Sequence, residues 1–435
     1  MSGLLIAAPS SGAGKTTVTL GLLRALHKKG VALAPGKAGP DYIDPAFHAA
    51  ASGEICLNFD PWAMRRELLL ANAALHRSGG RTLVVEAMMG LFDGAADGTG
   101  SPADLAATLG LSVILVVDCA KMSHSVAALV SGFANFRIDT RIAGVILNRV
   151  GSDRHEAMLR LALDSIRMPI FAVVRTDTGL GLPERHLGLV QAGEHGTLEA
   201  FIEHAAAAVT SDCDLAQLIR AAKQVPDRTS DANIDRLAPL GQRIAVARDL
   251  AFAFSYEHML LGWRRRGAEI RFFSPLANEA PPADCDAVYL PGGYPELHAG
   301  ALAAAERFRT GVTESSARGV RVFGECGGYM TLGDGLIDAE GREHRMLGLL
   351  PLTTSFRERK RHLGYRKVKP LAGTFFDHAM TAHEFHYATI VSEGDADRLF
   401  EATDALDMPL GAVGLRRGSV AGSFMHLIDL AGDHA

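Results

Sequence analysis

Short apolar runs alternate with longer stretches of helical periodicity along most of this chain, and this rhythm limits the folds that are open to it. Typical runs lie at residues 83–85, 113–117, 144–147 and 170–174. Apolar, β-branched runs of this length, separated by helices, are typical of a parallel sheet that is covered on both faces. The alternation therefore predicts an α/β fold built on parallel sheets.

The chain has 435 residues, which is more than a single hydrophobic core usually supports. A polar stretch at residues 223–231 continues to Gly241 and interrupts the alternation, and a new apolar run begins at Ile244. We therefore expect a linker at residues 224–241, between an N-terminal domain of residues 1–223 and a C-terminal domain of residues 242–435.

Composition and charge exclude several classes of protein. Apolar residues make up 48% of the chain, and its net charge of −5 gives no general basic field for nucleic acid or a membrane surface. Apolar runs such as residues 111–117 are far shorter than a membrane span, so we expect neither a membrane anchor nor a signal peptide. Five cysteines without CxxC pairs argue against a disulfide framework and a zinc site, and they favour the cytoplasm.

A phosphate-binding loop is predicted at residues 9–17 (PSSGAGKTT), between an expected strand at residues 4–8 and an expected helix at residues 18–27. Glycines let backbone N–H groups converge on phosphate oxygens, Lys15 reaches the β and γ oxygens, and the Thr16 hydroxyl is positioned for magnesium. The standard motif has glycine where this chain has Pro9. The residues expected to bind ATP are Gly12, Ala13, Gly14, Lys15, Thr16 and Thr17.

Further segments of the N-terminal half place charged side chains after expected strands. Glu86 ends one strand, where a second magnesium contact is expected, and Asp93 lies in the glycine-punctuated loop that follows. Residues 37–45, KAGPDYIDP, fix a lysine and two aspartates in a rigid segment. We expect substrate or phosphate to face Lys37, Asp41, Tyr42, Asp44 and Asp93, and magnesium to bind Thr16, Asp41 and Glu86.

Some of these residues have a structural explanation as well. Function is favoured for Lys37 and Asp41, since neither is needed for a turn. Asp44 and Pro45 are equally well explained as the start of a helix. Asn148 is expected to read the nucleotide base, or else to be an ordinary turn residue at the end of a strand.

In the C-terminal half, one cysteine lies between small residues directly after the apolar run at residues 320–323. The sequence Gly324-Glu325-Cys326-Gly327-Gly328 has the form of the nucleophile elbow of class I glutamine amidotransferases. These enzymes attack the side-chain amide of glutamine and release ammonia. Gly293, in paired glycines after another expected strand, and Gly327 are expected to donate backbone N–H groups to the oxyanion.

Cys326 needs a base, because the thiolate is the attacking species. His426, which follows a short expected strand, is the expected base. Many class I enzymes carry a carboxylate two residues beyond this histidine, but here that residue is Ile428, and Asp429 lies one step farther. We therefore expect a Cys–His dyad and leave the group that orients the histidine open.

Two other segments carry clusters of titratable residues. His383 and His386 flank Glu384 with a spacing that is weak evidence for a metal site, and no third ligand cluster accompanies them, so we interpret them as part of a structural or substrate-facing strand. The basic run at residues 356–366 is either a solvated face or a patch that meets substrate carboxylates or the facing domain.

The phosphate loop, residues 37–45, residues 86–94, residues 182–189 and the elbow at Cys326 occur in the order of one known family. Over essentially the whole chain they resemble the cobyrinic or hydrogenobyrinic acid a,c-diamide synthase family of cobalamin biosynthesis. The resemblance implies a dethiobiotin-synthetase-like N-terminal domain and a class I glutamine amidotransferase-like C-terminal domain. It also implies ATP- and Mg²⁺-dependent amidation of the a and c acetate side chains of a corrin ring, with glutamine as nitrogen source.

We therefore expect a ligase that forms an acyl phosphate from ATP and a carboxylate, and ammonia released at Cys326 then displaces the phosphate. Metal-free hydrogenobyrinate is favoured over cobyrinate as the corrin substrate. One alternative is a related ligase for nickel-sirohydrochlorin or a cobyric acid-type substrate. Another is a nucleotide-switch ATPase with a degenerate amidotransferase domain. The sequence leaves the oligomeric state open, with a homodimer as one alternative.

Overall fold

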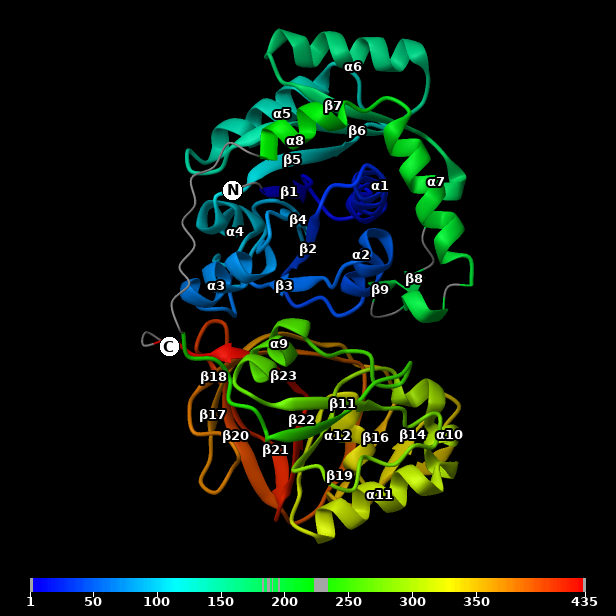
Figure 1. The fold of residues 1–435 in the computed structure, drawn as a ribbon, viewed down its shortest axis with the longest axis vertical. Helices are drawn as coiled ribbons and strands as arrows, with labels where there is room; N and C mark the ends of the chain where they lie inside the picture. Colours follow the sequence, from blue (N-terminus) through cyan, green and yellow to red (C-terminus); the bar gives the residue numbers. More distant parts are fainter. Residues whose placement is uncertain are drawn as a thin grey trace. The chain divides into compact units, whose positions relative to one another are not determined.

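A computed structural model of the chain describes residues 3–181, 184–185, 188–189, 191–194, 196–222 and 234–432 (Figure 1). The chain divides into two units, Met1–Ile234 and Asp235–Ala435. Residues 224–233 of the expected linker lie outside the described residues, so the expected domain limits stay a prediction. The motif at residues 182–189 also lies outside them, apart from the short strands β8 (Glu184–Arg185) and β9 (Gly188–Leu189).

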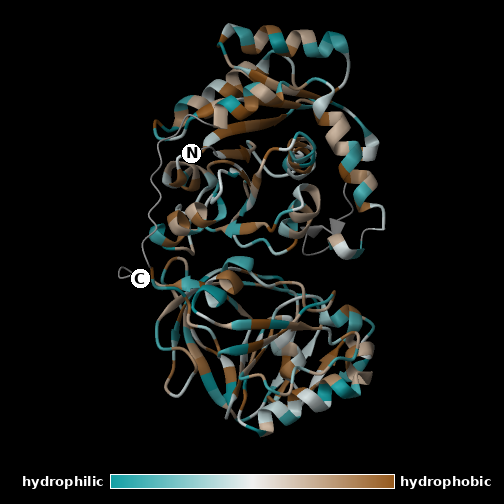
Figure 2. Ribbon diagram, in the orientation of Figure 1, coloured by the Kyte–Doolittle hydropathy of each residue, from teal (hydrophilic) through white to brown (hydrophobic). Residues whose placement is uncertain are grey.

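A sheet of seven parallel strands forms the centre of the N-terminal unit, in the order β3-β2-β4-β1-β5-β6-β7. Figure 2 shows its central strands coloured mainly as hydrophobic, which agrees with their burial. The strands are β1 (Gly3–Ala7), β2 (Leu33–Ala38), β3 (Leu57–Phe59), β4 (Thr82–Glu86), β5 (Ser112–Asp118), β6 (Ile142–Val150) and β7 (Ile170–Arg175). The predicted α/β fold with a parallel sheet is confirmed.

Helices cover both faces of this sheet, because right-handed crossovers in opposite directions along it place helices on opposite faces. Accordingly α1 packs against α2 and α7, whereas α3 packs against α4 and α5 against α6. The helices are α1 (Lys15–Lys28), α2 (Asp44–Ser52), α3 (Arg66–His76), α4 (Pro102–Leu109), α5 (Ser125–Phe136), α6 (Asp153–Ser165), α7 (Leu198–Thr210) and α8 (Leu215–Ala222).

Strand order and register bring the charged segments of the N-terminal unit together. Strands β2, β4 and β1 are neighbours, and Lys37 on β2 pairs in register with Glu86 on β4. Glu86 also pairs with Ile6 on β1, just before the phosphate loop. The carboxyl ends of three adjacent strands therefore carry the lysine, the glutamate and the loop.

The C-terminal unit contains a ten-stranded sheet in the order β11-β10-β12-β13-β22-β21-β20-β17-β18-β23. The first five strands are parallel to their neighbours, and the remaining pairings are antiparallel. Its strands are β10 (Arg243–Ala247), β11 (Glu269–Phe273), β12 (Ala287–Leu290), β13 (Arg321–Glu325), β17 (His362–Pro370), β18 (Met380–His386), β20 (Asp397–Asp404), β21 (Pro409–Arg417), β22 (Val420–Ser423) and β23 (Met425–Leu430).

A smaller sheet, four α-helices and a short 3-10 helix (Pro295–His298) make up the rest of the secondary structure in the described part of the C-terminal unit. The sheet has the order β15-β14-β16-β19, with β14 (Gly335–Ile337), β15 (Glu343–Arg345), β16 (Leu352–Ser355) and β19 (Thr389–Glu393). The helices are α9 (Glu257–Arg265), α10 (Ala299–Ala304), α11 (Glu306–Ala317) and α12 (Gly327–Leu332). In the part of the chain that the structure describes, no helix has the length and apolar character to cross a membrane.

Candidate active site

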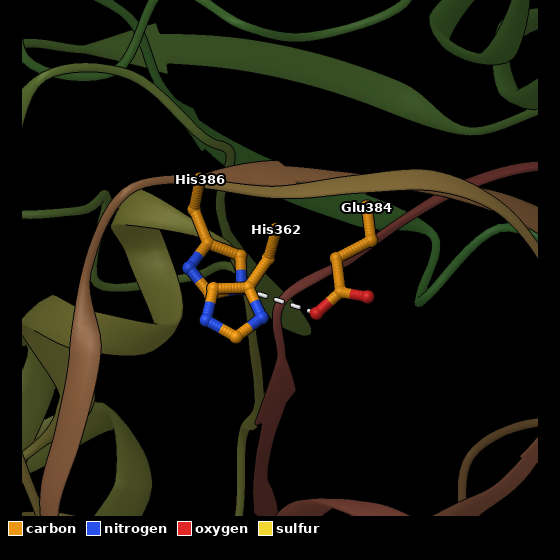
Figure 3. Close-up of side chains that lie close together, drawn as sticks. All are labelled: His362, Glu384 and His386. Atoms are coloured by element: carbon orange, nitrogen blue, oxygen red, sulfur yellow. Dashed lines mark hydrogen bonds and ion pairs between the residues drawn. The ribbon is translucent and has the colours of Figure 1, made fainter. Parts of the chain in front are cut away.

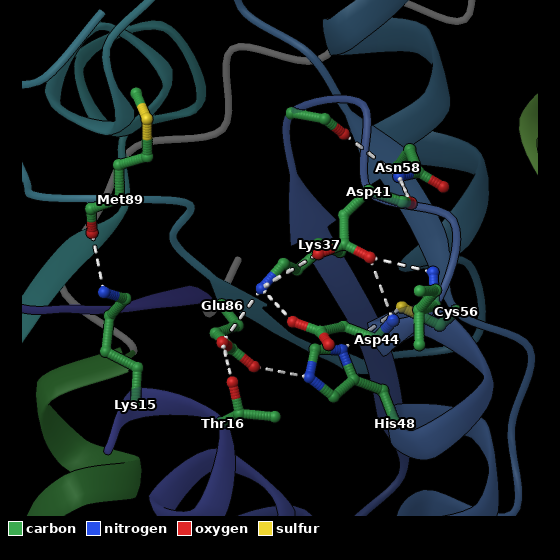
Figure 4. A network of polar contacts seen from close by, with 12 residues as sticks. Lys15, Thr16, Lys37, Asp41, Asp44, His48, Cys56, Asn58, Glu86 and Met89 are labelled. Atoms are coloured by element: carbon green, nitrogen blue, oxygen red, sulfur yellow. Dashed lines mark hydrogen bonds and ion pairs between the residues drawn. The ribbon is translucent and has the colours of Figure 1, made fainter. Parts of the chain in front are cut away.

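The phosphate loop lies between β1 and α1, and its lysine is held by backbone carbonyl groups. Gly14 caps α1 with a φ of 85°, a left-handed conformation that favours glycine. Lys15 Nζ donates hydrogen bonds to Met89 O at 2.6 Å and Ser10 O at 3.3 Å (Figure 4). Met89 itself has a φ of 53°, which directs a loop carbonyl at the ammonium group. Burial lowers the pKa of Lys15 to about 8.

Glu86, at the end of β4, is the centre of a buried polar network beside the loop (Figure 4). Its Oε1 accepts hydrogen bonds from Thr16 Oγ1 at 2.7 Å and Lys37 Nζ at 2.9 Å. Its Oε2 lies 2.6 Å from His48 Nε2, and His48 Nδ1 lies 3.5 Å from Cys56 Sγ. His48 was not predicted from the sequence, because only the position of α2, which packs on β2 beside β4, places it against Glu86.

Lys37 joins Glu86 to Asp44 inside the unit. Its Nζ lies 2.5 Å from Asp44 Oδ2, and its side chain is 4% exposed. Burial lowers the pKa of Lys37, but the carboxylates of Asp44 and Glu86 outweigh this effect and raise it above its usual value. Burial raises the pKa of Glu86, and the opposing charge of Lys37 brings it below the usual range. Burial and Asp41 raise the pKa of Asp44 to about 7.

Asp41 is needed for a turn, so the premise on which its function was favoured is wrong. Its Oδ1 accepts hydrogen bonds from the backbone N–H groups of Ile43 at 2.8 Å and Asp44 at 2.9 Å, just before α2 begins. An aspartate in this place satisfies N–H groups that a helix start leaves without intrahelical partners. Its Oδ2 lies 3.9 Å from Lys37 Nζ, and Asp44, not Asp41, makes the short ion pair.

The other expected residues of the nucleotide site surround the loop. Asn148 Nδ2 donates to Ala13 O at 2.8 Å, and its Oδ1 accepts from Arg149 N at 3.0 Å, so this side chain supports the loop backbone. Thr17 Oγ1 donates to Leu180 O at 3.2 Å. Asp93 Oδ2 accepts from Gly90 N at 2.8 Å and closes the loop after β4. Two more expected residues, Gly12 and Ala13, lie in the phosphate loop, and the half-buried Tyr42 lies in the loop between β2 and α2.

The oxygen atoms of Thr16 and Glu86 fit a magnesium ion. Magnesium prefers hydroxyl and carboxylate oxygens and keeps several waters, and Thr16 Oγ1 and Glu86 Oε1 are 2.7 Å apart, close enough to be neighbouring ligands. The third expected ligand, Asp41, uses its Oδ1 to accept two backbone N–H groups at the start of α2.

In the C-terminal unit, Cys326 lies on a sharp turn between β13 and α12. Its φ of 47° and ψ of −104° are strained for a residue with a side chain. The turn requires glycine at Gly328, where a β-carbon would overlap Leu290 O on the neighbouring strand. Cys326 as a whole residue is 3% exposed, and its Sγ lies 3.7 Å from Phe385 O. The predicted strand-to-helix turn is confirmed.

His426 lies beside this turn on β23, and Gly292 marks the place where the two side chains meet. A β-carbon on Gly292 would overlap His426 Cε1 and would lie 3.2 Å from His426 Nε2 and 3.4 Å from Cys326 Cβ. A β-carbon on Gly327 would lie 3.0 Å from Gly293 N, so the two expected oxyanion donors are close together. Gly292 was not predicted from the sequence, because its need for a small residue arises only from the position of the imidazole.

Burial keeps the nucleophile and the base in their neutral forms. It raises the pKa of the Cys326 thiol well above its usual range, and it lowers the pKa of His426 well below its usual value. His426 is flanked on β18 by His383, with which it pairs in register. Ionisation of the pair therefore depends on groups that stabilise the imidazolium.

Glu325, the residue before the nucleophile, is buried at this site and was also missed. Its Oε2 accepts a hydrogen bond from Tyr289 Oη at 2.7 Å, and its Oε1 accepts one from Leu427 N at 3.1 Å. Burial raises the pKa of Glu325 to about 8. His426 Nδ1 lies 3.8 Å from its Oε2. A glutamate in an otherwise apolar run was the available signal.

A third cluster joins His362 to Glu384 and His386 (Figure 3). The expectation that no third ligand accompanies this segment is wrong, because the antiparallel register of β17 and β18 pairs His362 with His386. The two rings stack with centroids 4.6 Å apart and an interplanar angle of 7°, so their in-plane nitrogens cannot both point at one ion. Glu384 instead pairs with Arg366 at 2.7 Å and His386 at 3.1 Å, which suits an ion-pair network.

Two families match the chain, and their matches cover different halves. Residues 4–190 match the CobQ/CobB/MinD/ParA nucleotide binding domain, and residues 243–433 match the CobB/CobQ-like glutamine amidotransferase domain. A Sinorhizobium sp protein named hydrogenobyrinate a,c-diamide synthase is 70% identical over 432 residues, which cover 99% of this chain and 100% of that protein. Proteins of the same name from Rhizobium meliloti (strain 1021) and Mesorhizobium japonicum are 68% and 48% identical, over 99% and 98% of this chain and 100% and 98% of their own lengths.

Proposed function

The chain belongs to the family of the hydrogenobyrinate a,c-diamide synthases, and from this premise we propose that it converts the a and c acetate groups of hydrogenobyrinate to amides, using ATP and glutamine. The observation that carries the proposal is the 70% identity to a relative of that name over nearly the full length of both chains. The two domain families account for the two half-reactions, since one binds a nucleotide and the other releases ammonia from glutamine.

In the nucleotide site, the residues of this chain would position ATP and a substrate carboxylate. Backbone N–H groups of the loop and Lys15 would hold the β- and γ-phosphates. Lys37, which is charged and buried between two carboxylates, would bind the transferring phosphoryl group or the attacking carboxylate. Bound magnesium would be held by Thr16 and Glu86 and would neutralise charge on the phosphates. The product of this step is an acyl phosphate.

In the glutamine site, Cys326 and His426 would carry out covalent catalysis. The thiol proton passes to His426 Nε2 as sulfur attacks the side-chain amide carbon, and the backbone N–H groups of Gly293 and Gly327 receive the oxyanion. The imidazolium then protonates the departing amine, which leaves as ammonia, and water hydrolyses the thioester to glutamate. Ammonia attacks the acyl phosphate and expels phosphate, which gives the amide.

Several finer points belong to the same proposal. The names of the relatives support hydrogenobyrinate over cobyrinate or another tetrapyrrole polyacid. A nucleotide switch with a degenerate amidotransferase domain is disfavoured, because it predicts the loss of a nucleophile or a base, and Cys326 and His426 lie together. Cytoplasmic location fits the free thiols of the described cysteines, and a homodimer stays a prediction.

The test is ATP-dependent conversion of hydrogenobyrinic acid with glutamine that carries heavy nitrogen in its amide. Mass spectrometry should show two successive acid-to-amide conversions that incorporate the label. Cys326→Ala should lose conversion with glutamine and keep it with ammonium chloride. An enzyme that hydrolyses glutamine but converts neither hydrogenobyrinic nor cobyrinic acid would refute the corrin assignment.

A further inference from the structure

His426 presents one ring nitrogen toward Glu325. His426 Nδ1 and Glu325 Oε2 are 3.8 Å apart, and the two side chains are 0% and 1% exposed. This distance exceeds that of a hydrogen bond, but catalytic hydrogen bonds are often long before substrate binds and tighten in the complex. Two buried groups at this distance, one of them the proposed base, attract each other strongly once both are charged.

Glu325 is fixed in place from two elements. Tyr289 on β12 donates its hydroxyl to Oε2 at 2.7 Å, and its ring packs edge-on against Trp263 and parallel to Phe323. The backbone N–H of Leu427, the residue after the proposed base, donates to Oε1 at 3.1 Å. The carboxyl group therefore links the strand that ends at the nucleophile to the strand that carries the base.

We propose that Glu325 is the positioning residue for His426: its carboxylate accepts the Nδ1–H of the imidazole and stabilises the imidazolium that forms when Nε2 takes the thiol proton of Cys326. This inference rests on the proposed glutaminase reaction. It supplies the orienting group from the residue before the nucleophile, whereas the class I pattern places that group after the histidine.

Each proton that moves in this step has a defined donor and acceptor. When the carboxylate is charged, it holds the imidazole hydrogen on Nδ1, so Nε2 offers its lone pair to the thiol. The thiol proton moves to Nε2 and later leaves with ammonia, so Glu325 ends each half-reaction in the form in which it began. The other charged or titratable groups that face His426 are His383, His386 and Glu384, and Tyr289 faces Glu325.

The same contacts predict how pH governs the reaction. Because burial raises the pKa of Glu325 to about 8, its carboxyl is largely protonated at lower pH, where it is a weaker acceptor for the Nδ1–H and carries no charge to stabilise the imidazolium. Glutaminase kcat should therefore rise with pH through this range. Tyr289→Phe removes a donor that favours the carboxylate, so the rise should move to higher pH.

The alternative orienting acid is Asp429, which is 1% exposed and lies on the same strand as His426. Its Oδ1 accepts a hydrogen bond from Leu430 N at 2.8 Å, which directs that oxygen to the end of the strand. The two assignments of the orienting acid thus predict opposite results for Glu325→Gln and Asp429→Asn.

The experiment measures glutaminase kcat and KM across pH for wild type, Glu325→Gln, Asp429→Asn, Tyr289→Phe and Cys326→Ala, with ammonium-dependent amidation as a second readout. In Glu325→Gln the amide N–H₂ would face Nδ1 and favour the tautomer with hydrogen on Nε2, which cannot accept the thiol proton. We expect a fall in kcat of about 10- to 100-fold, within the range of general-base effects, with KM unchanged, the pH-dependent rise lost and ammonium-dependent amidation retained. Asp429→Asn should keep the wild-type profile.

Two results would overturn the inference. One is that Glu325→Gln keeps the kcat and the pH profile of wild type. The other is that the increase of kcat with pH is lost in Asp429→Asn and in no other variant. If Glu325→Gln does not fold, as judged by loss of ammonium-dependent amidation, an unshifted pH profile in Tyr289→Phe refutes the inference. Failure of the proposed function is distinguishable, because then wild type and Cys326→Ala hydrolyse glutamine equally.

Discussion

Replacing Gly292 by alanine should disable the glutamine site and leave the nucleotide site intact. The added β-carbon would overlap His426 Cε1, and it would lie only 3.2 Å from Nε2 and 3.4 Å from Cys326 Cβ. Ordinary carbon contacts require the imidazole to move by about 1 Å, and a displacement of this size costs about 100-fold in rate when it separates reacting groups. We therefore expect glutaminase kcat to fall by about 100-fold.

Gly300→Ala is the matched control, since Gly300 lies in α10 and its β-carbon would meet only His344, at 3.7 Å. The assay compares glutamine-dependent and ammonium-dependent amidation in both variants. Gly292→Ala should lose only the first, and Gly300→Ala should keep both. Wild-type glutaminase in Gly292→Ala would show that the imidazole does not lie beside Cys326 as described, and would refute the assignment of His426 as the base.

Four further predictions concern charge and burial. Lys37→Met leaves Asp44 and Glu86 buried without their cation, so urea unfolding should show a loss of about 3–5 kcal/mol and amidation should fail with either nitrogen source. In the same urea assay, Asp41→Ala should lower the free energy of unfolding by about 1 kcal/mol, whereas Asp41→Asn, which can still cap α2, should lower it little. Equal losses in the two variants would contradict the capping role. Burial raises the pKa of Glu325 to about 8 in the folded state, so wild type should lose stability relative to Glu325→Gln as pH rises from the ordinary glutamate value toward 8, and the difference in Tm should widen over that window. Because burial raises the pKa of Cys326, iodoacetamide should alkylate it at pH 7 more slowly than a free cysteine; faster alkylation would contradict a neutral thiol.

The sequence predicted those features that depend on short segments of chain. The alternation of apolar runs and helices predicted the parallel sheet, and the glycines around Cys326 predicted the strained turn, because both depend on local conformational preference. The phosphate loop was likewise read from contiguous residues. In each case a single segment contains the whole signal.

The features that the sequence analysis missed depend on register between distant segments. Glu325 meets His426 only because β13 pairs with β22, which precedes β23. His362 meets His386 through the antiparallel pairing of β17 and β18. The premise that Asp41 is not needed for a turn was wrong for a different reason: whether its carboxylate caps a helix depends on where α2 begins, and helix boundaries are among the features that a sequence predicts least well.

The reactive groups are charged in the nucleotide site and neutral in the glutamine site, and each state suits the chemistry of its site. In the nucleotide site, Lys37 stays charged despite burial because carboxylates surround it, so a fixed positive charge is in place before phosphoryl transfer, when negative charge must be stabilised. In the glutamine site, burial favours a neutral thiol, a neutral imidazole and a protonated carboxyl. An ion pair there must form during the reaction, and its free energy depends on one buried carboxylate next to the base. Deprotonation of Glu325 therefore makes the transfer of the Cys326 thiol proton to His426 depend on the pH of the solution.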